Sequence, residues 1–268
     1  MSVVPPTAAR NANVATTLTV VRGLKVLRAF RAESVPLGNA DLVRRTALSK
    51  ATVSRITSTL RILGYLAQVP GSRKFQLGMR ALSLGHAYVE ASPIMEAARP
   101  HLQKLADRLN VSVALAVGND TDMLYLAYCK SARIATLHFG VGSVLPMAST
   151  SIGRAWLWSL PPSERQAHIA AIARHAGKEA TAIRKRFTAA FSDLDRFGYC
   201  LSLGEYQRDA FGVAAPLRAG TRDTPMALAC GAAALGLDAD ELRKKLGPEV
   251  KRAAEDLARV LADLDCTP

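Results

Sequence analysis

One short basic segment combines the residue types that contact nucleic-acid bases. Ser49 precedes a run of residues with helical periodicity, so its hydroxyl can cap the first turn of that helix. Four side chains then follow in the first turns: Lys50, Ala51, Thr52 and Arg55. Cationic and hydroxyl side chains near the start of a helix are those that a recognition helix presents to base edges and phosphates. The segment therefore predicts contact with DNA.

The surrounding residues predict a helix-turn-helix followed by a two-stranded wing. Four apolar residues recur at helical spacing: Val53, Ile56, Leu60 and Leu63. This spacing predicts a recognition helix over residues 49–63 whose apolar face is buried, and a shorter helix is expected before it over residues 39–45. A turn at residues 70–72 separates two short strands. We expect Arg73 and Lys74 at the tip of this wing, near the DNA backbone.

The distribution of charge supports the same interpretation. The chain of 268 residues has a formal net charge of +13, of which +10 falls within residues 1–90 and +3 within residues 91–268. Positive charge concentrated around the motif is expected when phosphate contacts supply much of the binding free energy. A membrane-surface role would need a further apolar helix face, but the apolar positions here are already required for the core of the domain.

Length and composition favour two domains. A hydrophobic content of 49% is sufficient for two cores. We expect a disordered N-terminus, a winged helix-turn-helix domain, a linker helix and a second domain, over residues 1–15, 16–78, 79–92 and 93–268. No apolar run approaches the roughly 20 residues that span a bilayer, and the first residues lack the apolar segment of a signal peptide. A cytoplasmic location is therefore expected.

The second domain has the pattern of an α+β fold. Strands are expected over residues 111–117, 123–129, 134–139, 199–203, 211–218 and 225–231, with a hairpin turn at residues 118–120. Helices are expected over residues 94–109, 152–159, 161–176, 178–196 and 250–264. An antiparallel sheet of about six strands flanked by helices is typical of a sensor-like domain.

The cysteines and histidines form no recognisable site. Four cysteines lie far apart, without a CxxC pair or a Cys/His cluster: Cys129, Cys200, Cys230 and Cys266. We therefore expect no disulfide, no metal, no cofactor and no catalytic residue, and we expect the first three thiols to be buried in strands. Two alternatives remain open. One is a redox regulator that uses Cys129, Cys200 or Cys230, and the other is an enzyme whose DNA-binding domain serves autoregulation.

Several short motifs follow one another along the chain in a characteristic order and spacing. They include Leu48-Ser49-Lys50-Ala51-Thr52-Val53, Gly64-Tyr65-Leu66, Gly142-Ser143-x-Leu145-Pro146, Ser149-Thr150-Ser151-Ile152-Gly153-Arg154-Ala155 and Phe197-Gly198-Tyr199. Over about residues 18–265 this set resembles the IclR family of bacterial transcriptional regulators. The resemblance implies a winged helix-turn-helix that dimerises on a palindromic operator in double-stranded DNA. It also implies a GAF-like effector-binding domain that often drives tetramerisation, so a homodimer or a homotetramer is expected.

The segment Ser149 to Ser151 is the predicted start of the effector site. Hydroxyls and free N–H groups at a helix N-terminus favour a carboxylate, although a helix cap without a ligand is the alternative. The resemblance implies six effector-contacting residues: Met147, Thr150, Ser151, Ile152, Ser202 and Glu205. For Glu205 a solvated loop carboxylate is the alternative. The Thr-Ser-x-Gly-Arg sequence at 150–154 resembles the branch that includes regulators of aromatic-acid catabolism. We expect a small organic acid effector, with aromatic acids among the candidates, and control of a catabolic operon.

Overall fold

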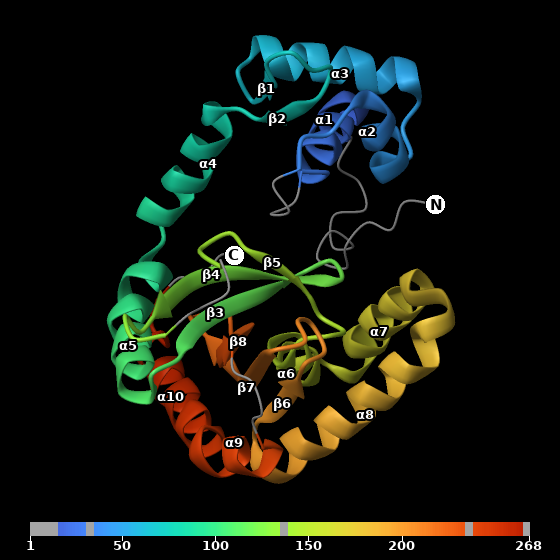
Figure 1. Ribbon diagram of the computed structural model, residues 1–268. Coiled ribbons are helices and arrows are strands. Elements are labelled where there is room, and N and C mark those ends of the chain that lie inside the picture. Colours follow the sequence, from blue (N-terminus) through green and yellow to red (C-terminus); the bar gives the residue numbers. More distant parts are fainter. Residues whose placement is uncertain (1–15, 31–34, 135–138, 234–237, 265–268) are drawn as a thin grey trace. The chain divides into compact units, whose positions relative to one another are not determined.

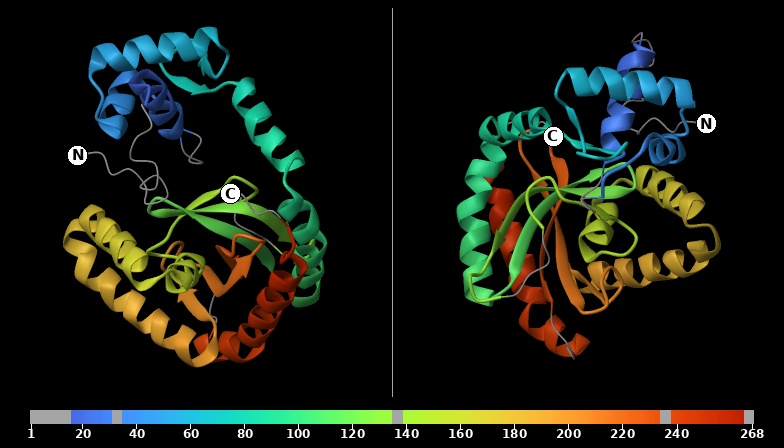
Figure 2. Two further views of the ribbon diagram at one scale, coloured as in Figure 1. Left: turned by 180° about the vertical axis from the view of Figure 1, so that it is seen from behind. Right: turned by 45° about the horizontal axis from the view of Figure 1, so that its top comes forward.

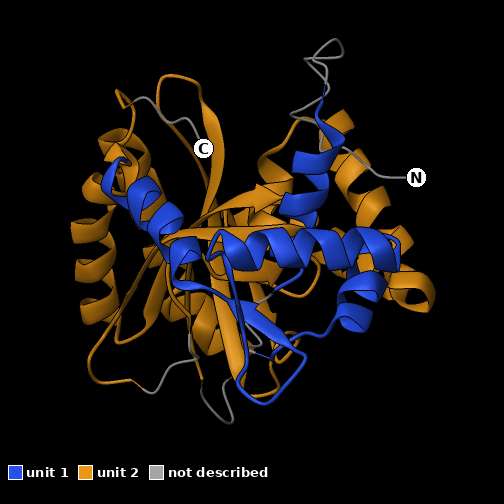
Figure 3. Cartoon of the chain, turned by 90° about the horizontal axis from the view of Figure 1, so that it is seen from above, with its two compact units in different colours: residues 1–91 blue, residues 92–268 orange. Residues whose placement is uncertain are grey.

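Figure 1 and Figure 2 show the computed structural model, which describes residues 16–30, 35–134, 139–233 and 238–264. The chain forms two compact units, residues 1–91 and residues 92–268, coloured separately in Figure 3. The segment expected to be disordered, residues 1–15, lies outside the described residues. The helix expected as a linker is α4 (Met79–Glu90), and it groups with the first unit.

The first unit has a winged helix-turn-helix arrangement in its described part. Its elements before α4 are α1 (Leu18–Arg28), α2 (Asn39–Thr46), α3 (Lys50–Ile62), β1 (Leu66–Gln68) and β2 (Phe75–Leu77). The two strands pair antiparallel to form the wing. The helices and β1 enclose a small core that includes Val26, Leu42, Val53, Leu60 and Leu66. Three helices and a hairpin therefore supply the frame that holds α3 at the surface.

The ends of α2 and α3 are set by local hydrogen bonds. The Gly38 N–H donates to the Asp41 carboxylate at the start of α2, at 2.9 Å, which lowers the pKa of Asp41. Ala47 ends this helix in the left-handed region, with φ of 54°. The predicted cap at Ser49 is present, because its hydroxyl accepts a hydrogen bond from the Thr52 N–H at 3.3 Å. The turn between the helices is thus encoded within about ten residues.

One expected core position in α3 was wrong. Leu63 is 47% exposed, because the helix ends at Ile62 and Leu63 already belongs to the following turn. Thr57 is buried in its place, and its hydroxyl donates to the Val53 carbonyl at 3.0 Å. A buried hydroxyl satisfied by its own helix can occupy a core position that apolar periodicity alone does not reveal.

The second unit is built on a six-stranded antiparallel sheet with the order β5-β4-β3-β8-β7-β6. The strands are β3 (Ser112–Asn119), β4 (Asp122–Lys130), β5 (Val144–Pro146), β6 (Cys200–Leu203), β7 (Ala210–Ala219) and β8 (Thr224–Ala233). The helices are α5 (Pro93–Leu109), α6 (Ser151–Ser159), α7 (Pro162–Ala176), α8 (Ala180–Phe197), α9 (Ala239–Lys245) and α10 (Gly247–Val260), with the 3₁₀ turn η2 (Gly177–Glu179) before α8. The predicted α+β class is confirmed.

Three details of this unit differ from the sequence expectations. The strand expected over 134–139 falls largely on residues 135–138, outside the described residues, and its ends Ile134 and Phe139 are not in strands. The sixth strand is instead β5. The β3–β4 turn lies at 120–121, because Asn119 still pairs with Asp122. Helix α9 was not expected, since its seven residues are mostly charged and lack apolar periodicity.

The two faces of the sheet carry side chains of different size. Helices α5 and α10 lie on one side of the sheet (Figure 1), and larger residues such as Val113 and Leu115 pack in the core cluster with them. Small residues such as Ala114, Ala214 and Ala229 face α6, α7 and α8 on the other side. Because helices cannot approach a sheet more closely than their own side chains allow, a face of small residues can leave unfilled space.

Candidate functional site

A cavity of about 80 Å³ lies on the small-residue face of the sheet, beside the N-terminus of α6. Its floor crosses three strands, where Ser112 of β3, Gly231 of β8 and Gly212 of β7 lie side by side in register. Ala114 and Ala229 form the next row of the floor. None of these five residues has a long side chain, so the floor stays low and the space above it remains open.

Five of the six residues expected at the effector site line this cavity: Thr150, Ser151, Ile152, Ser202 and Glu205. Met147 is not among the lining residues. Its side chain is fully buried in the core under α6, and its backbone packs so closely against Gly153 that a Cβ there would lie 2.3 Å from the Met147 Cα. In this structure Met147 therefore has a packing role, and its expected contact with the effector stays a prediction.

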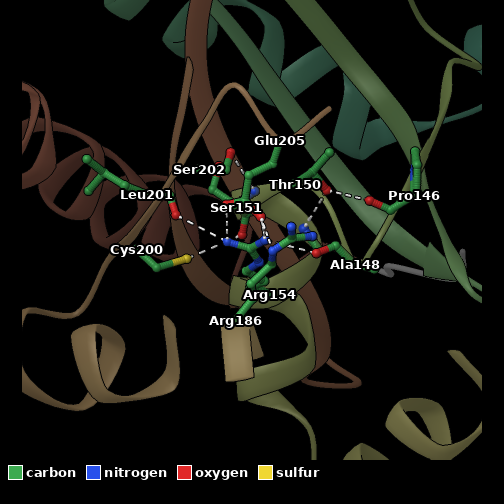
Figure 4. Close-up of polar contacts among 11 residues, drawn as sticks. Pro146, Ala148, Thr150, Ser151, Arg154, Arg186, Cys200, Leu201, Ser202 and Glu205 are labelled. Carbon is green, nitrogen blue, oxygen red and sulfur yellow. Dashed lines mark hydrogen bonds and ion pairs between the residues drawn. The ribbon is translucent and has the colours of Figure 1, made fainter. Parts of the chain in front are cut away.

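The N-terminus of α6 is capped by hydroxyl groups (Figure 4). Thr150 Oγ1 accepts from the Gly153 N–H at 3.4 Å and donates to the Pro146 carbonyl at 2.7 Å. The Ser151 N–H donates to Ser202 Oγ, at 3.1 Å, which joins the helix to β6. The expectation of free N–H groups at this helix end thus needs correction, since two of them already have partners. Hydroxyl groups supply the polar surface that faces the cavity.

A buried ion pair holds the edge of the cavity in place. Arg154 is only 3% exposed, and its guanidinium forms two hydrogen bonds with the Glu205 carboxylate, one of them 2.8 Å long (Figure 4). The Ala148 carbonyl accepts a further hydrogen bond from Arg154 at 2.9 Å, and Arg186 lies 3.3 Å from the same carboxylate. Glu205 is therefore a paired carboxylate rather than a solvated one. A buried guanidinium requires such a partner.

Arg154 was not among the residues expected at this site from the sequence. One signal was present, because Arg154 interrupts an otherwise apolar run in α6 in which Ile152, Ala155 and Leu157 are buried. A cation in the buried turn of a helix needs a buried anion, and Glu205 lies 51 residues further along the chain. Periodicity within α6 does not indicate where that anion comes from.

Aromatic side chains form the other wall of the cavity. Tyr125, Tyr128, Phe139 and Tyr206 all line it. The rings of Tyr125 and Tyr128 stack with centroids 6.2 Å apart, and Phe139 meets Tyr125 edge-on at 6.0 Å. Burial raises the pKa of Tyr125, so this phenol stays neutral. None of these four residues was expected at the effector site from the sequence.

Three cysteines are buried in strands, as expected: Cys129 in β4, Cys200 in β6 and Cys230 in β8. Burial raises the pKa of Cys200 and of Cys230 to about 12, and it also raises the pKa of Cys129. Redox-sensing cysteines are accessible and readily ionised. These buried, protonated thiols therefore argue against the redox alternative, while Cys266 lies outside the described residues.

The residues expected to contact DNA lie on α3 and the wing. Lys50, Ala51 and Arg55 are exposed on the helix, Ser49 is exposed at its cap, and Thr52 is half-buried beside Ser49. Arg73 and Lys74 are exposed in the turn that joins β1 to β2. The fold thus presents positive side chains from both elements of the winged helix-turn-helix.

The described residues contain no cluster of three or more side chains suited to a metal ion. Among the described helices, none is long and apolar enough to cross a bilayer.

Comparisons with known proteins assign both units. Residues 19–70 match the IclR helix-turn-helix domain, and residues 86–259 match the bacterial transcriptional regulator IclR C-terminal domain. The chain belongs to the IclR family. It is accordingly a DNA-binding transcriptional regulator of the IclR type with an effector-binding C-terminal domain.

Individual members of the IclR family support this assignment. The HTH-type transcriptional regulator TsaQ1/TsaQ2 of Comamonas testosteroni is 32% identical over 240 residues, covering 89% of this chain and 86% of that protein. The crystal structure of an IclR family regulator from Brucella abortus is 34% identical, covers 91% of this chain and 92% of that chain, and superposes with a TM-score of 0.83. An IclR homologue from Microbacterium hydrocarbonoxydans, crystallised with 4-hydroxybenzoate, shares the fold at 21% identity, with a TM-score of 0.66 and coverage of 91% of this chain and 98% of that chain.

Proposed function

We propose that this regulator senses a small aromatic carboxylate that binds in the cavity beside α6. The observation that carries the proposal is the meeting of two serine hydroxyls, those of Ser151 and Ser202, with a wall of aromatic rings in one cavity; the Thr150 hydroxyl also lines it but already donates to the Pro146 carbonyl. Hydroxyl donors suit a carboxylate, and the rings suit an apolar ring system. The 4-hydroxybenzoate bound by the Microbacterium hydrocarbonoxydans homologue belongs to the same chemical class.

The charges next to the cavity are compatible with an anion. Glu205 is the one charged residue among the described residues that line it, and the guanidinium groups of Arg154 and Arg186 lie against its carboxylate. These two cations offset the negative charge of Glu205, which would otherwise repel a ligand carboxylate. Glu205 accepts a hydrogen bond from a polar substituent of the ligand.

The size of the cavity limits the ligand to a small molecule. Its volume is about 80 Å³, whereas a cavity of roughly 150 Å³ holds benzene in a protein core. A single ring therefore enters only if the rim widens. Tyr206 is 40% exposed at this rim, so we propose that it moves outward when the ligand binds.

The test uses calorimetry with benzoate, hydroxybenzoates and short aliphatic acids. In Gly212→Ala an added Cβ would lie 2.7 Å from Ser151 Oγ and 3.2 Å from Ser202 Oγ, within the hydroxyl end of the cavity. We expect this variant to bind acids at least about tenfold more weakly than the parent while its operator affinity without ligand is unchanged.

Gly140→Ala is the matched control, because a Cβ at Gly140 meets nothing within 4 Å. It should bind acids as the parent does. Effective ligands that all lack an anionic group, or equal acid affinity in Gly212→Ala and the parent, would contradict the carboxylate proposal.

We propose further that α3 and the wing contact a palindromic operator in double-stranded DNA, bound by a homodimer or a homotetramer. The proposed contact residues are Ser49, Lys50, Ala51, Thr52, Arg55, Arg73 and Lys74. Residues on α3 lie in the major groove, and the wing residues lie near phosphates. Six of these seven residues are exposed and Thr52 is half-buried, which supports this arrangement. Substitution of Arg55 and of Lys74 tests it.

A further inference from the structure

The strand β4 contains a β-bulge that changes which side chains face the cavity. Ala114 pairs with Tyr128 and Leu115 with Ala127, but Ala116 pairs with Tyr125, so Leu126 is an extra residue in β4. Side chains three positions apart face opposite sides of a regular strand. The bulge instead places Tyr125 and Tyr128 on the same face of the sheet. Their partners on the neighbouring strand β3 are the small residues Ala116 and Ala114.

One of these two tyrosines has a hydroxyl group with no hydrogen-bond partner among the described residues. The Tyr128 hydroxyl oxygen is buried, yet within the described residues no group forms a hydrogen bond with it. Tyr128 also lines the cavity, with its ring stacked on Tyr125. A buried hydroxyl without a partner is costly, and the great majority of buried polar groups in native proteins have one. Because the oxygen itself is buried, a ligand reaches it only when the rim of the cavity widens, and a partner supplied in this way accounts for both its burial and its position.

The topology of the sheet separates this hydroxyl from the serine end of the cavity. Tyr128 belongs to β4, and Gly212, where an added Cβ would meet both serine hydroxyls, belongs to β7. Strands β3 and β8 lie between them. Three strand spacings of about 4.8 Å place the two backbones roughly 14 Å apart. A ligand that spans the cavity therefore has one end at Ser151 and Ser202 and the other end at the tyrosines.

The chemistry of the tyrosine end favours a neutral polar group. No Lys, Arg or His is among the described residues that line the cavity. The phenols of Tyr125, Tyr128 and Tyr206 can donate or accept a hydrogen bond but cannot neutralise a second carboxylate. A hydroxyl on the ligand ring satisfies the same groups without burying another charge.

We propose that Tyr128 is a specificity-determining residue that binds a hydroxyl group on the aromatic ring of the effector, at the end remote from the carboxylate. The proposal rests on the proposed function, because it assumes that an aromatic acid occupies this cavity. It names hydroxylated benzoates as the ligand class, in preference to benzoate itself. The β-bulge is the structural feature that makes this contact possible.

The experiment compares the dissociation constants of benzoate and of 2-, 3- and 4-hydroxybenzoate for the parent and for Tyr128→Phe. In the parent, at least one hydroxybenzoate should bind about tenfold more tightly than benzoate. In Tyr128→Phe this preference should fall to about twofold or less, while benzoate affinity stays within about twofold. The ligand-free variant should unfold at the same temperature as the parent or a higher one, because an unpartnered hydroxyl has been removed.

Tyr199→Phe is the matched control. The Tyr199 hydroxyl donates to the Arg243 carbonyl at 3.0 Å and does not line the cavity, so its loss should lower the unfolding temperature without altering the preference. If Tyr128→Phe keeps the parent's preference for a hydroxybenzoate over benzoate, the role of Tyr128 is overturned and the proposed function still stands. If no aromatic acid binds the parent, the proposed function itself fails, and this inference fails with it.

Discussion

At the residue scale, Arg154 shows how a buried charge is tolerated beside a ligand cavity. Its guanidinium is neutralised by Glu205, and the backbone carbonyls of Ala148 and Leu201 occupy two more of its hydrogen-bonding directions. Such a pair adds little net stability relative to an apolar replacement. Removing only one partner is strongly destabilising, because it leaves an uncompensated charge in the core.

We therefore expect Glu205→Gln to lower the free energy of unfolding by about 3 kcal/mol in urea denaturation. The double variant Arg154→Met/Glu205→Gln should lose less free energy of unfolding than Glu205→Gln alone, because no buried unpaired guanidinium remains and Arg186 is half exposed. Asp223→Asn is the control: its pair with Arg218 is solvent-exposed, and its loss should cost less than about 1 kcal/mol. Equal costs for Glu205→Gln and Asp223→Asn would show that Arg154 does not depend on Glu205.

At the element scale, α3 and the wing differ in what they offer to DNA. A helix in the major groove can read base edges, whereas a wing tip contacts mainly the backbone. Arg55 lies one turn into α3, and Lys74 lies in the turn directly before β2. Base contacts and phosphate contacts have different signatures in binding experiments, so the two residues can be told apart.

Arg55→Ala should weaken binding to the native operator by about 1–3 kcal/mol and relax the preference for that sequence. Lys74→Ala should weaken all DNA sequences alike and reduce the slope of log affinity against log salt concentration by about one. Lys178→Ala, at an exposed position of the second unit, serves as the control for loss of charge. Gel-shift titrations at several salt concentrations measure the DNA affinity of all three variants. Unchanged operator affinity in Arg55→Ala would disprove the base contact.

At the scale of the whole molecule, the first unit leaves many apolar side chains exposed in a single chain. On α1 these include Leu18 at 62% and Leu24 at 55%, and on α4 Met79 at 91% and Leu82 at 76%. Contiguous exposed apolar residues typically mark an interaction surface. We take them as support for the proposed homodimer, since a palindromic operator requires two copies of α3.

Leu82→Glu should accordingly shift the protein toward monomer in sedimentation velocity experiments. It should also weaken operator binding at nanomolar protein concentration, because two half-sites are then bound separately. Ser83→Glu, on the same helix, adds the same charge at an exposed polar position and should have little effect. A Leu82→Glu protein that sediments as the parent does would argue against a dimer contact on α4.

The sequence by itself determined the features that depend on near neighbours in the chain. The Ser49 cap, the helix α3, the wing turn and most strand positions follow from local periodicity and turn residues, and five of the six expected effector residues line one cavity. These features arise because a helix, a cap or a turn is specified by contacts within a few residues.

The tertiary structure decided the features that depend on distant partners. The pairing of Arg154 with Glu205 joins residues 51 positions apart, and the packing of Met147 under α6 follows from the same fold. The bulge in β4 depends on the register of β3, and that register alone brings Tyr128 to the cavity. Such positions are set by packing and strand pairing across the whole sheet, which a one-dimensional pattern does not contain.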